Sequence, residues 1–249
     1  MDSPARKKIL VLVEGEKSDV LVMEKLFEIY SELDAKYQII SYRTNIYVLY
    51  GEFFHDDEDE DDYDLLQVLK SREHDPEKKK ILDDKYTDIL LIFDLDPQDQ
   101  MFTEDKIRRM QAYFCESSDM GKLYLNYPMI EAFFHMPVIP DADYTYRTTT
   151  MTELICKKYK ERVNRESRGK DYRKFITSRK DSNYVILENI RKAFMILDDD
   201  AEVTDVWRRL DLDSILSTQL KCLCTGYLHV LCTCVVYIYD YNSALLFQN

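Results

Sequence analysis

Three carboxylates stand directly behind two strongly apolar stretches of this 249-residue chain. Glu14 follows the apolar run 9–13, and Asp94 and Asp96 follow the run 89–93. Residues two apart in an extended chain point the same way, so Asp94 and Asp96 can aim their carboxylates at one place. Carboxylates held close together raise one another's pKa values unless a cation is present. A cluster of such hard oxygen atoms suits Mg²⁺ or Mn²⁺.

The elements that must position these carboxylates are strands. Each apolar run is too short to cross a membrane and is typical of a strand that is buried on both faces. Gly15 allows a sharp turn into the amphipathic stretch 17–31, which we expect to form a helix capped by Ser18 or Asp19. Ligands of open α/β sheets bind at the carboxyl ends of the strands. If the two strands are neighbours, the three carboxylates meet at one edge of the sheet.

A third polar stretch is delivered in the same way. The short apolar run 123–125 is expected to be a strand that ends at Asn126. Pro128 is expected in the first turn of a helix that carries Glu131. Strand and helix patterns alternate along residues 1–140, which predicts an α/β fold with a mainly parallel sheet flanked by helices.

Residues 141–249 are expected to form a second, mostly helical domain. The periodicity predicts helices over 151–168, 213–224 and 226–246, although residues 235–239 could instead form a strand. The segment 156–180 holds eleven Lys or Arg against three Asp or Glu. That mixture, with interleaved aromatic residues, suits phosphate contact and base stacking, and a solvated helix face is equally consistent with it. The candidate nucleic-acid contacts are Lys170, Arg173, Lys174, Arg179 and Lys180.

Two of these stretches resemble the signature motifs of the Toprim domain, the metal-dependent catalytic domain of topoisomerases, DnaG-type primases and the OLD family of nucleases. Residues 13–19 (VEGEKSD) carry a glutamate after the first strand, and residues 93–96 (FDLD) carry an Asp-x-Asp after a later one. Residues 126–134 (NYPMIEAFF) are similar to the asparagine/glutamate stretch of small stand-alone Toprim nucleases, which are often found in bacterial phage-defence operons. The resemblance covers residues 1–140 and implies a Rossmann-like Toprim fold there.

The resemblance implies a Mg²⁺-dependent or Mn²⁺-dependent endonuclease that hydrolyses phosphodiester bonds in DNA or RNA, tRNA included. Asp94 and Asp96 would hold the metal, and Glu14 would be a further metal ligand or a general acid/base. Glu131 would belong to the catalytic set and would complete the metal shell. Lys17, or a residue of the basic segment, would neutralise charge on the scissile phosphate.

The resemblance also implies partners. The chain has no G-x-x-x-x-G-K-[ST] loop, so it lacks the ATPase half of the OLD nucleases. Relatives of this architecture commonly work beside a separate ATPase. We therefore expect a toxin effector of an anti-phage defence system that a partner ATPase controls, and a homodimer is compatible with that role.

Two other classes of function stay open. The stretch 93–96 also resembles the nucleophile motif of haloacid-dehalogenase-type phosphatases, although Pro97 and Gln98 replace the small residue and the threonine expected there. The other class is a non-catalytic metal-binding sensor or scaffold protein whose helical domain docks a partner. The acidic run 56–64 is interpreted as a solvated loop, with a nucleic-acid mimic as the sharper alternative.

The composition is that of an ordinary globular protein, with 45% hydrophobic and 33% charged residues. A net charge of −13 argues against a protein that coats nucleic acid indiscriminately, but not against a nuclease with a local basic groove. No stretch suits a transmembrane helix, and residues 1–8 leave no room for a signal peptide, so we expect a cytoplasmic protein without membrane contact. The paired cysteines are expected to be core residues in preference to a zinc site: Cys222, Cys224, Cys232 and Cys234.

Overall fold

The apolar runs form a sheet of five strands. The computed structural model describes residues 7–33, 35–54, 64–118, 120–167, 176–197 and 209–247. The strands lie in the order β2-β1-β3-β5-β4, with the first four parallel and the short β4 antiparallel to β5. The fold is therefore α/β with a mainly parallel sheet, as predicted. The strand bounds are β1 Lys7–Val13, β2 Ala35–Ser41, β3 Asp88–Asp94, β4 Cys115–Glu116 and β5 Gly121–Asn126.

β1 and β3 lie side by side within the sheet, and their apolar runs are covered on both faces. Every residue of 9–13 and 89–93 is at most 3% exposed. Burying each such Val, Leu or Ile contributes about 1.5–3 kcal/mol. The register sets Asp94 beside Asn126 and places the end of β1 beside the end of β3. The polar groups that follow the strands therefore reach the same edge of the sheet, and the prediction that the two strands are neighbours is confirmed.

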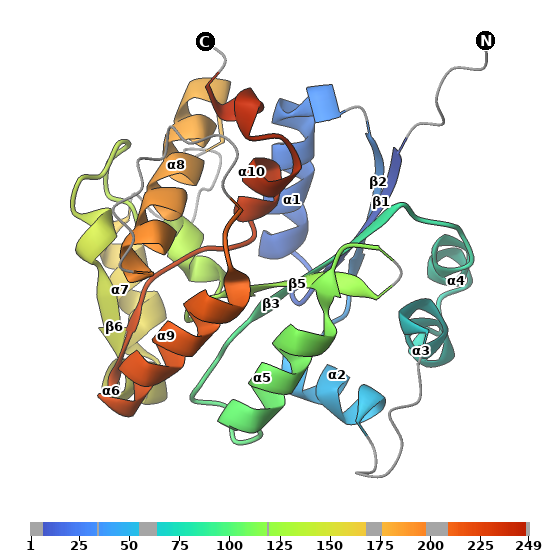
Figure 1. Ribbon diagram of the computed structural model, residues 1–249, viewed down its shortest axis with the longest axis horizontal. Coiled ribbons are helices and arrows are strands. Elements are labelled where there is room, and N and C mark those ends of the chain that lie inside the picture. The colour runs from blue at the N-terminus through green and yellow to red at the C-terminus, as the bar shows by residue number, and fades with distance from the viewer. Residues whose placement is uncertain are drawn as a thin grey trace.

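Helices cover both faces of the sheet (Figure 1). α1 (Ser18–Ile29) and α10 (Val236–Asn242) lie on one face, and α8 (Arg179–Ile196) packs beside α10. The other face is covered by α2 (Ile46–Phe53), α3 (Leu65–Arg72), α4 (Pro76–Leu82) and α5 (Glu104–Tyr113). Polar side chains cap these four helices by accepting hydrogen bonds from backbone N–H groups that would otherwise lack partners. The caps are Asn45, Asp64, Asp75 and Thr103.

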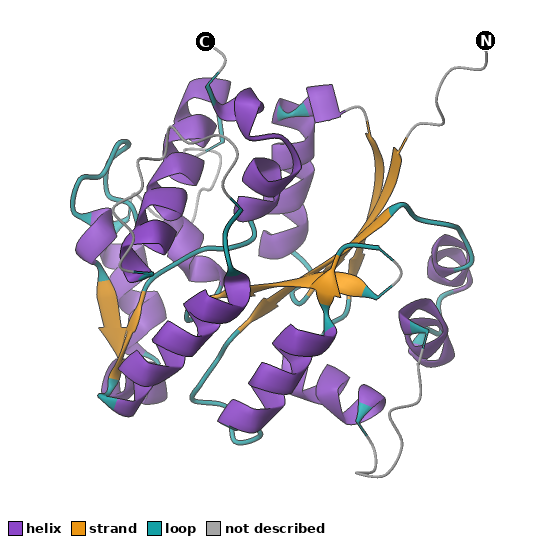
Figure 2. Cartoon of the chain, viewed as in Figure 1, coloured by secondary structure: helices purple, strands orange, loops and turns teal. Residues whose placement is uncertain are grey.

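The chain after residue 140 adds a small second sheet and further helices (Figure 2). β6 (Thr148–Thr150) pairs antiparallel with β7 (Tyr227–His229). Tyr127, just beyond β5, exchanges two backbone hydrogen bonds of 2.8 Å with Leu231, which joins this part to the main sheet. One buried core runs through both parts, and the division into domains 1–140 and 141–249 stays a prediction. The remaining helices are α6 (Met151–Ile155), α7 (Lys158–Glu166) and α9 (Leu212–Cys224).

Two of the expected helices differ from the observed elements. The stretch 151–168 is broken into α6 and α7 because Lys157 adopts a left-handed φ of 58°. The stretch 226–246 is not one helix, since Gly226, with a φ of 92°, leads into β7, and α10 begins only at Val236. The alternative of a strand over the start of α10 is also wrong.

Some expectations fall on residues that the structure does not describe. These are the acidic run, of which residues 56–63 lie outside the described ranges, and the candidate contacts Lys170, Arg173 and Lys174. Within the described ranges, no helix combines the length and the apolar composition needed to cross a bilayer.

Candidate metal centre

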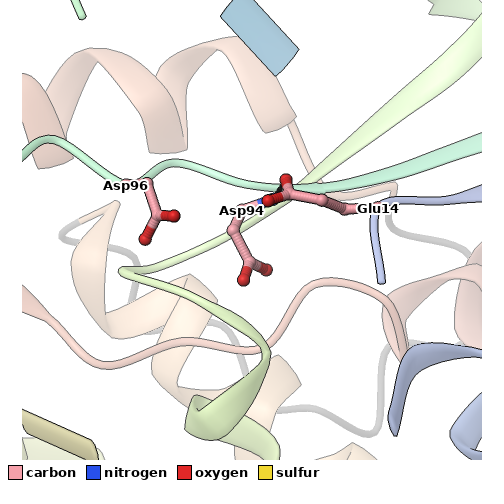
Figure 3. Close-up of side chains that lie close together, drawn as sticks. All are labelled: Glu14, Asp94 and Asp96. Carbon is pink, nitrogen blue, oxygen red and sulfur yellow. Dashed lines mark hydrogen bonds between the residues drawn. The ribbon is translucent and has the colours of Figure 1, made fainter. Parts of the chain in front are cut away.

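The carboxylates of Glu14, Asp94 and Asp96 converge at the carboxyl edge of the sheet (Figure 3). One oxygen atom from each lies within 4.8 Å of those of the other two. Glu14 directly follows β1, Asp94 is the last residue of β3, and Asp96 lies in the turn that follows. The structure thus brings the three predicted carboxylates together.

Hydrogen bonds hold Glu14 against the end of β3. Its N–H donates to the carbonyl oxygen of Ile92 at 3.1 Å. Its Oε2 accepts from the N–H of Asp94, also at 3.1 Å (Figure 3). The second bond turns the Glu14 side chain along the sheet edge toward the aspartates, so the two strand ends form one site.

The two aspartates converge through a turn and not through strand alternation. Asp96 has a φ of 40°, which lies in the left-handed region. Its N–H donates to the carbonyl of Pro128 at 3.0 Å, and its Oδ1 accepts from the Gln98 side chain at 2.9 Å. The convergence agrees with the prediction, whereas the extended geometry behind that prediction is wrong. Backbone strain of this kind costs about 1–3 kcal/mol and gathers at functional sites.

Burial makes these carboxylates hard to ionise. The pKa of Glu14 is raised to about 8, first by burial and then by the charges of Asp96 and Asp19, against the hydrogen bond from the Asp94 N–H. Burial, followed by the Glu14 charge, raises the pKa of Asp94 well above its usual range. Burial also raises the pKa of Asp96. Part of the cluster therefore holds protons at neutral pH, and a divalent cation would displace them.

Asp19 joins the cluster, although the sequence points to it only as a helix cap. Lys17 occupies the N-cap position of α1, and no side chain caps that helix, so the predicted cap is wrong. The Asp19 carboxylate is buried against Gly15, where a Cβ would lie 2.4 Å from its Oδ2. Burial raises the pKa of Asp19, and the charge of Glu131 acts in the same direction. A side chain at position 15 would therefore displace this carboxylate.

Glu131 reaches the cluster from the short 3₁₀ helix Ile130–Phe134, which Pro128 precedes and does not begin as expected. Its Oε1 accepts from Lys160 Nζ on α7 at 3.1 Å. Its Oε2 is buried and has no hydrogen-bond partner in the described part of the chain. Buried polar atoms are normally paired, so this oxygen is a candidate ligand atom for a bound cation or water.

Lys160, a residue of the basic segment 156–180, provides the positive charge expected from Lys17 or from that segment. Lys17 is exposed, whereas the charge of Lys160 lowers the pKa values of Glu14, Asp19 and Asp96. The pKa of Lys160 itself is raised, because nearby carboxylates outweigh the lowering by burial. Its membership of the segment 156–180 was the only sequence signal, and nothing there distinguishes it from ten other basic residues.

His135 is buried, and its side chain contacts α7, the helix that carries Lys160. Its Nε2 lies 2.9 Å from a Glu166 carboxylate oxygen, and its Nδ1 lies 3.3 Å from the Tyr159 hydroxyl. Burial lowers the pKa of His135 to about 4, so the ring is neutral at pH 7. These contacts assign a tautomer in which Nε2–H donates to the carboxylate and Nδ1 accepts from the hydroxyl.

Asn126 supports the cluster from the end of β5. It is fully buried, and its Nδ2 donates to Asp94 Oδ1 at 3.2 Å. Its Oδ1 accepts from the N–H groups of Thr233 at 3.1 Å and Cys234 at 3.3 Å. A single amide therefore ties the loop before α10 to the acidic cluster, and Asn126 lies at this edge of the sheet as predicted.

The four C-terminal cysteines do not gather into one zinc site. Cys222 and Cys224 lie at the end of α9, and Cys224 is exposed. Cys232 and Cys234 are buried with their Sγ atoms 3.1 Å apart. Among the described residues, the group of His, Cys, Asp and Glu side chains with suitable spacing for a metal is the acidic cluster. The predicted core position is confirmed for Cys232 and Cys234 and wrong for Cys224.

Of the predicted nucleic-acid contacts, Arg179 and Lys180 lie within the described residues. Arg179 pairs with Glu32 and donates to the carbonyls of Ile29 at 3.3 Å and Leu245 at 3.1 Å. Its charge thus ties the start of α8 to the end of α1 and to the C-terminal turn. Lys180 is exposed.

Comparisons with known proteins give no match for this chain. No family model matches it, and neither does any curated protein or solved structure. The residues of the acidic cluster are therefore the basis for any function assigned to it.

Proposed function

We propose that this chain is a Toprim-type nuclease that uses a divalent metal ion to hydrolyse phosphodiester bonds in DNA or RNA. The observation that supports it most is the convergence of three carboxylates from two adjacent strand ends. Burial raises the pKa values of all three, which is costly unless a cation compensates. Clustered, perturbed carboxylates of this kind are characteristic of functional sites.

The residues present fit Mg²⁺ or Mn²⁺. Glu14, Asp94 and Asp96 offer three carboxylate oxygens that lie within 4.8 Å of one another. An all-oxygen donor set favours these hard cations over zinc, which prefers nitrogen and sulfur ligands. When bound, such an ion polarises the phosphate and stabilises the leaving oxygen.

The chain's own groups then supply positioning and proton transfer. The ion pair with Lys160 orients Glu131 and leaves its Oε2 free to take a proton from the attacking water. Lys160, in the role expected of Lys17, offsets the negative charge of the phosphate. Asn126 keeps the Asp94 carboxylate aimed at the site.

We further propose that a separate ATPase controls this nuclease as part of an anti-phage defence system, with the chain acting as a homodimer. The proposal rests on the resemblance to stand-alone Toprim nucleases. The lack of a G-x-x-x-x-G-K-[ST] phosphate-binding loop in the sequence supports the need for a separate ATPase.

The test is cleavage of plasmid, single-stranded DNA and total tRNA by the wild type, with Mg²⁺, Mn²⁺ or EDTA, with and without co-purifying protein. Asp94→Asn keeps the shape of a metal-holding side chain and should abolish cleavage. Asp88→Asn is the matched control, because Asp88 begins the same strand and bonds to Ser117 at the opposite end. Expression of each variant in cells adds a readout that needs no added partner.

Metal-dependent cleavage that is lost in Asp94→Asn and kept in Asp88→Asn would support the proposal and identify the substrate. No cleavage, together with equal cellular effects of all three proteins, would contradict it and favour a metal-binding sensor or scaffold. Release of phosphate from small phosphomonoesters, without cleavage of nucleic acid, would favour a haloacid-dehalogenase-type phosphatase.

A further inference from the structure

A cavity of about 330 Å³ lies between the carboxyl ends of β1 and β2 and the helices α3 and α4. Buried apolar side chains of Leu12, Ile40 and Leu69 form part of its wall. The volume falls in the range of small-ligand sites, which combine apolar walls with a few polar groups. The polar side chains that line the cavity include Tyr42, Arg43, Arg72 and His74.

The backbone segment that lines the cavity is hydrogen-bonded to the end of β1, where Glu14 lies. The N–H of Arg43 donates to the carbonyl of Glu14 at 3.1 Å, and the N–H of Tyr42 donates to the carbonyl of Val13 at 2.8 Å. Arg43 holds a left-handed φ of 69°, a conformation that non-glycine residues rarely adopt and that clusters at ligand sites. The backbone of Arg43, a residue that lines the cavity, is therefore bonded directly to the residue that begins the acidic cluster.

The wall offers a planar stacking surface. The Arg72 guanidinium lies over the Tyr42 ring, with its carbon 4.7 Å from the ring centroid. Glu52 pairs with Arg72 at 2.7 Å, and Phe93 meets the Tyr42 ring edge-on with centroids 5.7 Å apart. These contacts hold the aromatic and guanidinium planes in place before any ligand binds. Unpaired bases of nucleic acids stack on such aromatic and arginine planes.

Arg43 is the group that can meet a phosphate. Its guanidinium pairs with Glu16 at 2.6 Å, and both side chains are more than half exposed. An exposed pair of this kind contributes little free energy, so a phosphate can replace Glu16 without a large penalty. The acidic side chains that line the cavity, Glu73 and Asp75, accept hydrogen bonds from backbone N–H groups. Glu73 accepts from two of them, and Asp75 caps α4.

We propose that this cavity binds one nucleotide of the substrate, with its base against the apolar wall and Tyr42 and its phosphate at Arg43. The proposal rests on the nuclease function proposed above and narrows its substrate. A base that is paired inside a duplex cannot enter such a cavity. The preferred substrate is therefore single-stranded nucleic acid, or a loop in which this base is unpaired.

The test uses the metal-free full chain in EDTA and four probes: AMP, UMP, ribose 5-phosphate and adenosine. Calorimetry measures binding to the wild type and to Leu69→Trp, whose larger side chain fills the cavity. Gln67→Trp is the matched control, because Gln67 is exposed on the same helix α3. Arg43→Asn provides a second variant that keeps the fold, since Asn tolerates the left-handed conformation. Circular dichroism checks the folding of each variant.

We expect AMP or UMP to bind with a Kd of about 1 mM or lower, and ribose 5-phosphate to bind at least about tenfold more weakly because it lacks a base. Leu69→Trp should weaken AMP binding at least about tenfold, while Gln67→Trp should bind as the wild type does. Arg43→Asn should weaken AMP more than adenosine. Equal binding of AMP and ribose 5-phosphate, no binding up to about 10 mM, or unchanged binding to Leu69→Trp would overturn the proposal.

Asp94→Asn separates this inference from the nuclease proposal, because it alters the metal centre and not the cavity. Nucleotide binding at the cavity, with no cleavage by any form of the protein, would contradict the proposed nuclease function and support the binding site. Cleavage that is equal for Leu69→Trp and the wild type, and equal for single strands and duplexes, would contradict the proposed role of the cavity and support the nuclease function.

Discussion

Replacing Asp94 by Asn should abolish the stabilisation of this protein by Mn²⁺ and should leave the metal-free protein at least as stable as the wild type. Asp94 is 7% exposed and carries a carboxyl group whose pKa is raised well above its usual range, first by burial and then by Glu14. Asn has the same shape and no charge to repel its neighbours. The substitution therefore removes one ligand for a cation together with one source of repulsion.

The pH dependence of the stability of the metal-free protein can be worked out from Glu14, whose pKa is raised from 4.5 to about 8. The native state holds this proton more tightly than the unfolded chain does. The metal-free protein therefore loses stability as the pH rises from 4.5 to 8, and the loss at pH 7 is about 3 kcal/mol. A cation at about 100 times its Kd adds about 2.7 kcal/mol to the free energy of unfolding. In a chain of this size that corresponds to a rise in Tm of about 5–10 °C.

Thermal unfolding in EDTA and in saturating Mn²⁺ measures this effect for the wild type, Asp94→Asn and the control Asp88→Asn. The wild type and Asp88→Asn should gain the full shift, and the gain should be larger at pH 8 than at pH 6, because the metal displaces protons. An equal metal shift in Asp94→Asn would refute the reasoning. So would a metal-free Asp94→Asn protein several kcal/mol less stable than the wild type.

Three further predictions concern the groups around the cluster. Lys160→Met should lower the free energy of unfolding in EDTA by about 1–2 kcal/mol, because Glu131 loses its partner and the half-exposed lysine limits the loss; an unchanged urea midpoint would contradict this. Asn126→Ala should lower the free energy of unfolding by about 2–4 kcal/mol in the same assay, because two buried N–H groups of the loop before α10 lose their acceptor. A loss below that range would mean that water replaces the amide. His135 has a pKa of about 4 against 6.5 in the unfolded chain, so its contribution is complete above pH 6.5 and declines as the pH falls, by about 2–3 kcal/mol at pH 4.5. Urea unfolding of His135→Gln at pH 7 and pH 4.5 should lack this part of the decline.

The sequence alone determined the strands and the carboxylates that follow them. The runs 9–13 and 89–93 contain no polar residue, so both faces of each run are favourably placed only when they are buried. Short runs of that kind are typical of strands in a parallel sheet. A polar residue directly behind such a run must lie at the sheet edge. Some helix starts are also decided locally: Asn45 and Thr103 cap α2 and α5, because each accepts a hydrogen bond from an N–H group three residues along the chain.

The tertiary structure decided which polar groups meet. Lys160 pairs with Glu131 across 29 positions of sequence only because α7 packs against the short helix that carries Glu131. The left-handed turn at Asp96 likewise depends on a hydrogen bond to Pro128, a residue far along the chain. Periodicity reports how each segment buries its own apolar face. Which charges face one another is set by the packing of distant segments, and no local pattern contains that information.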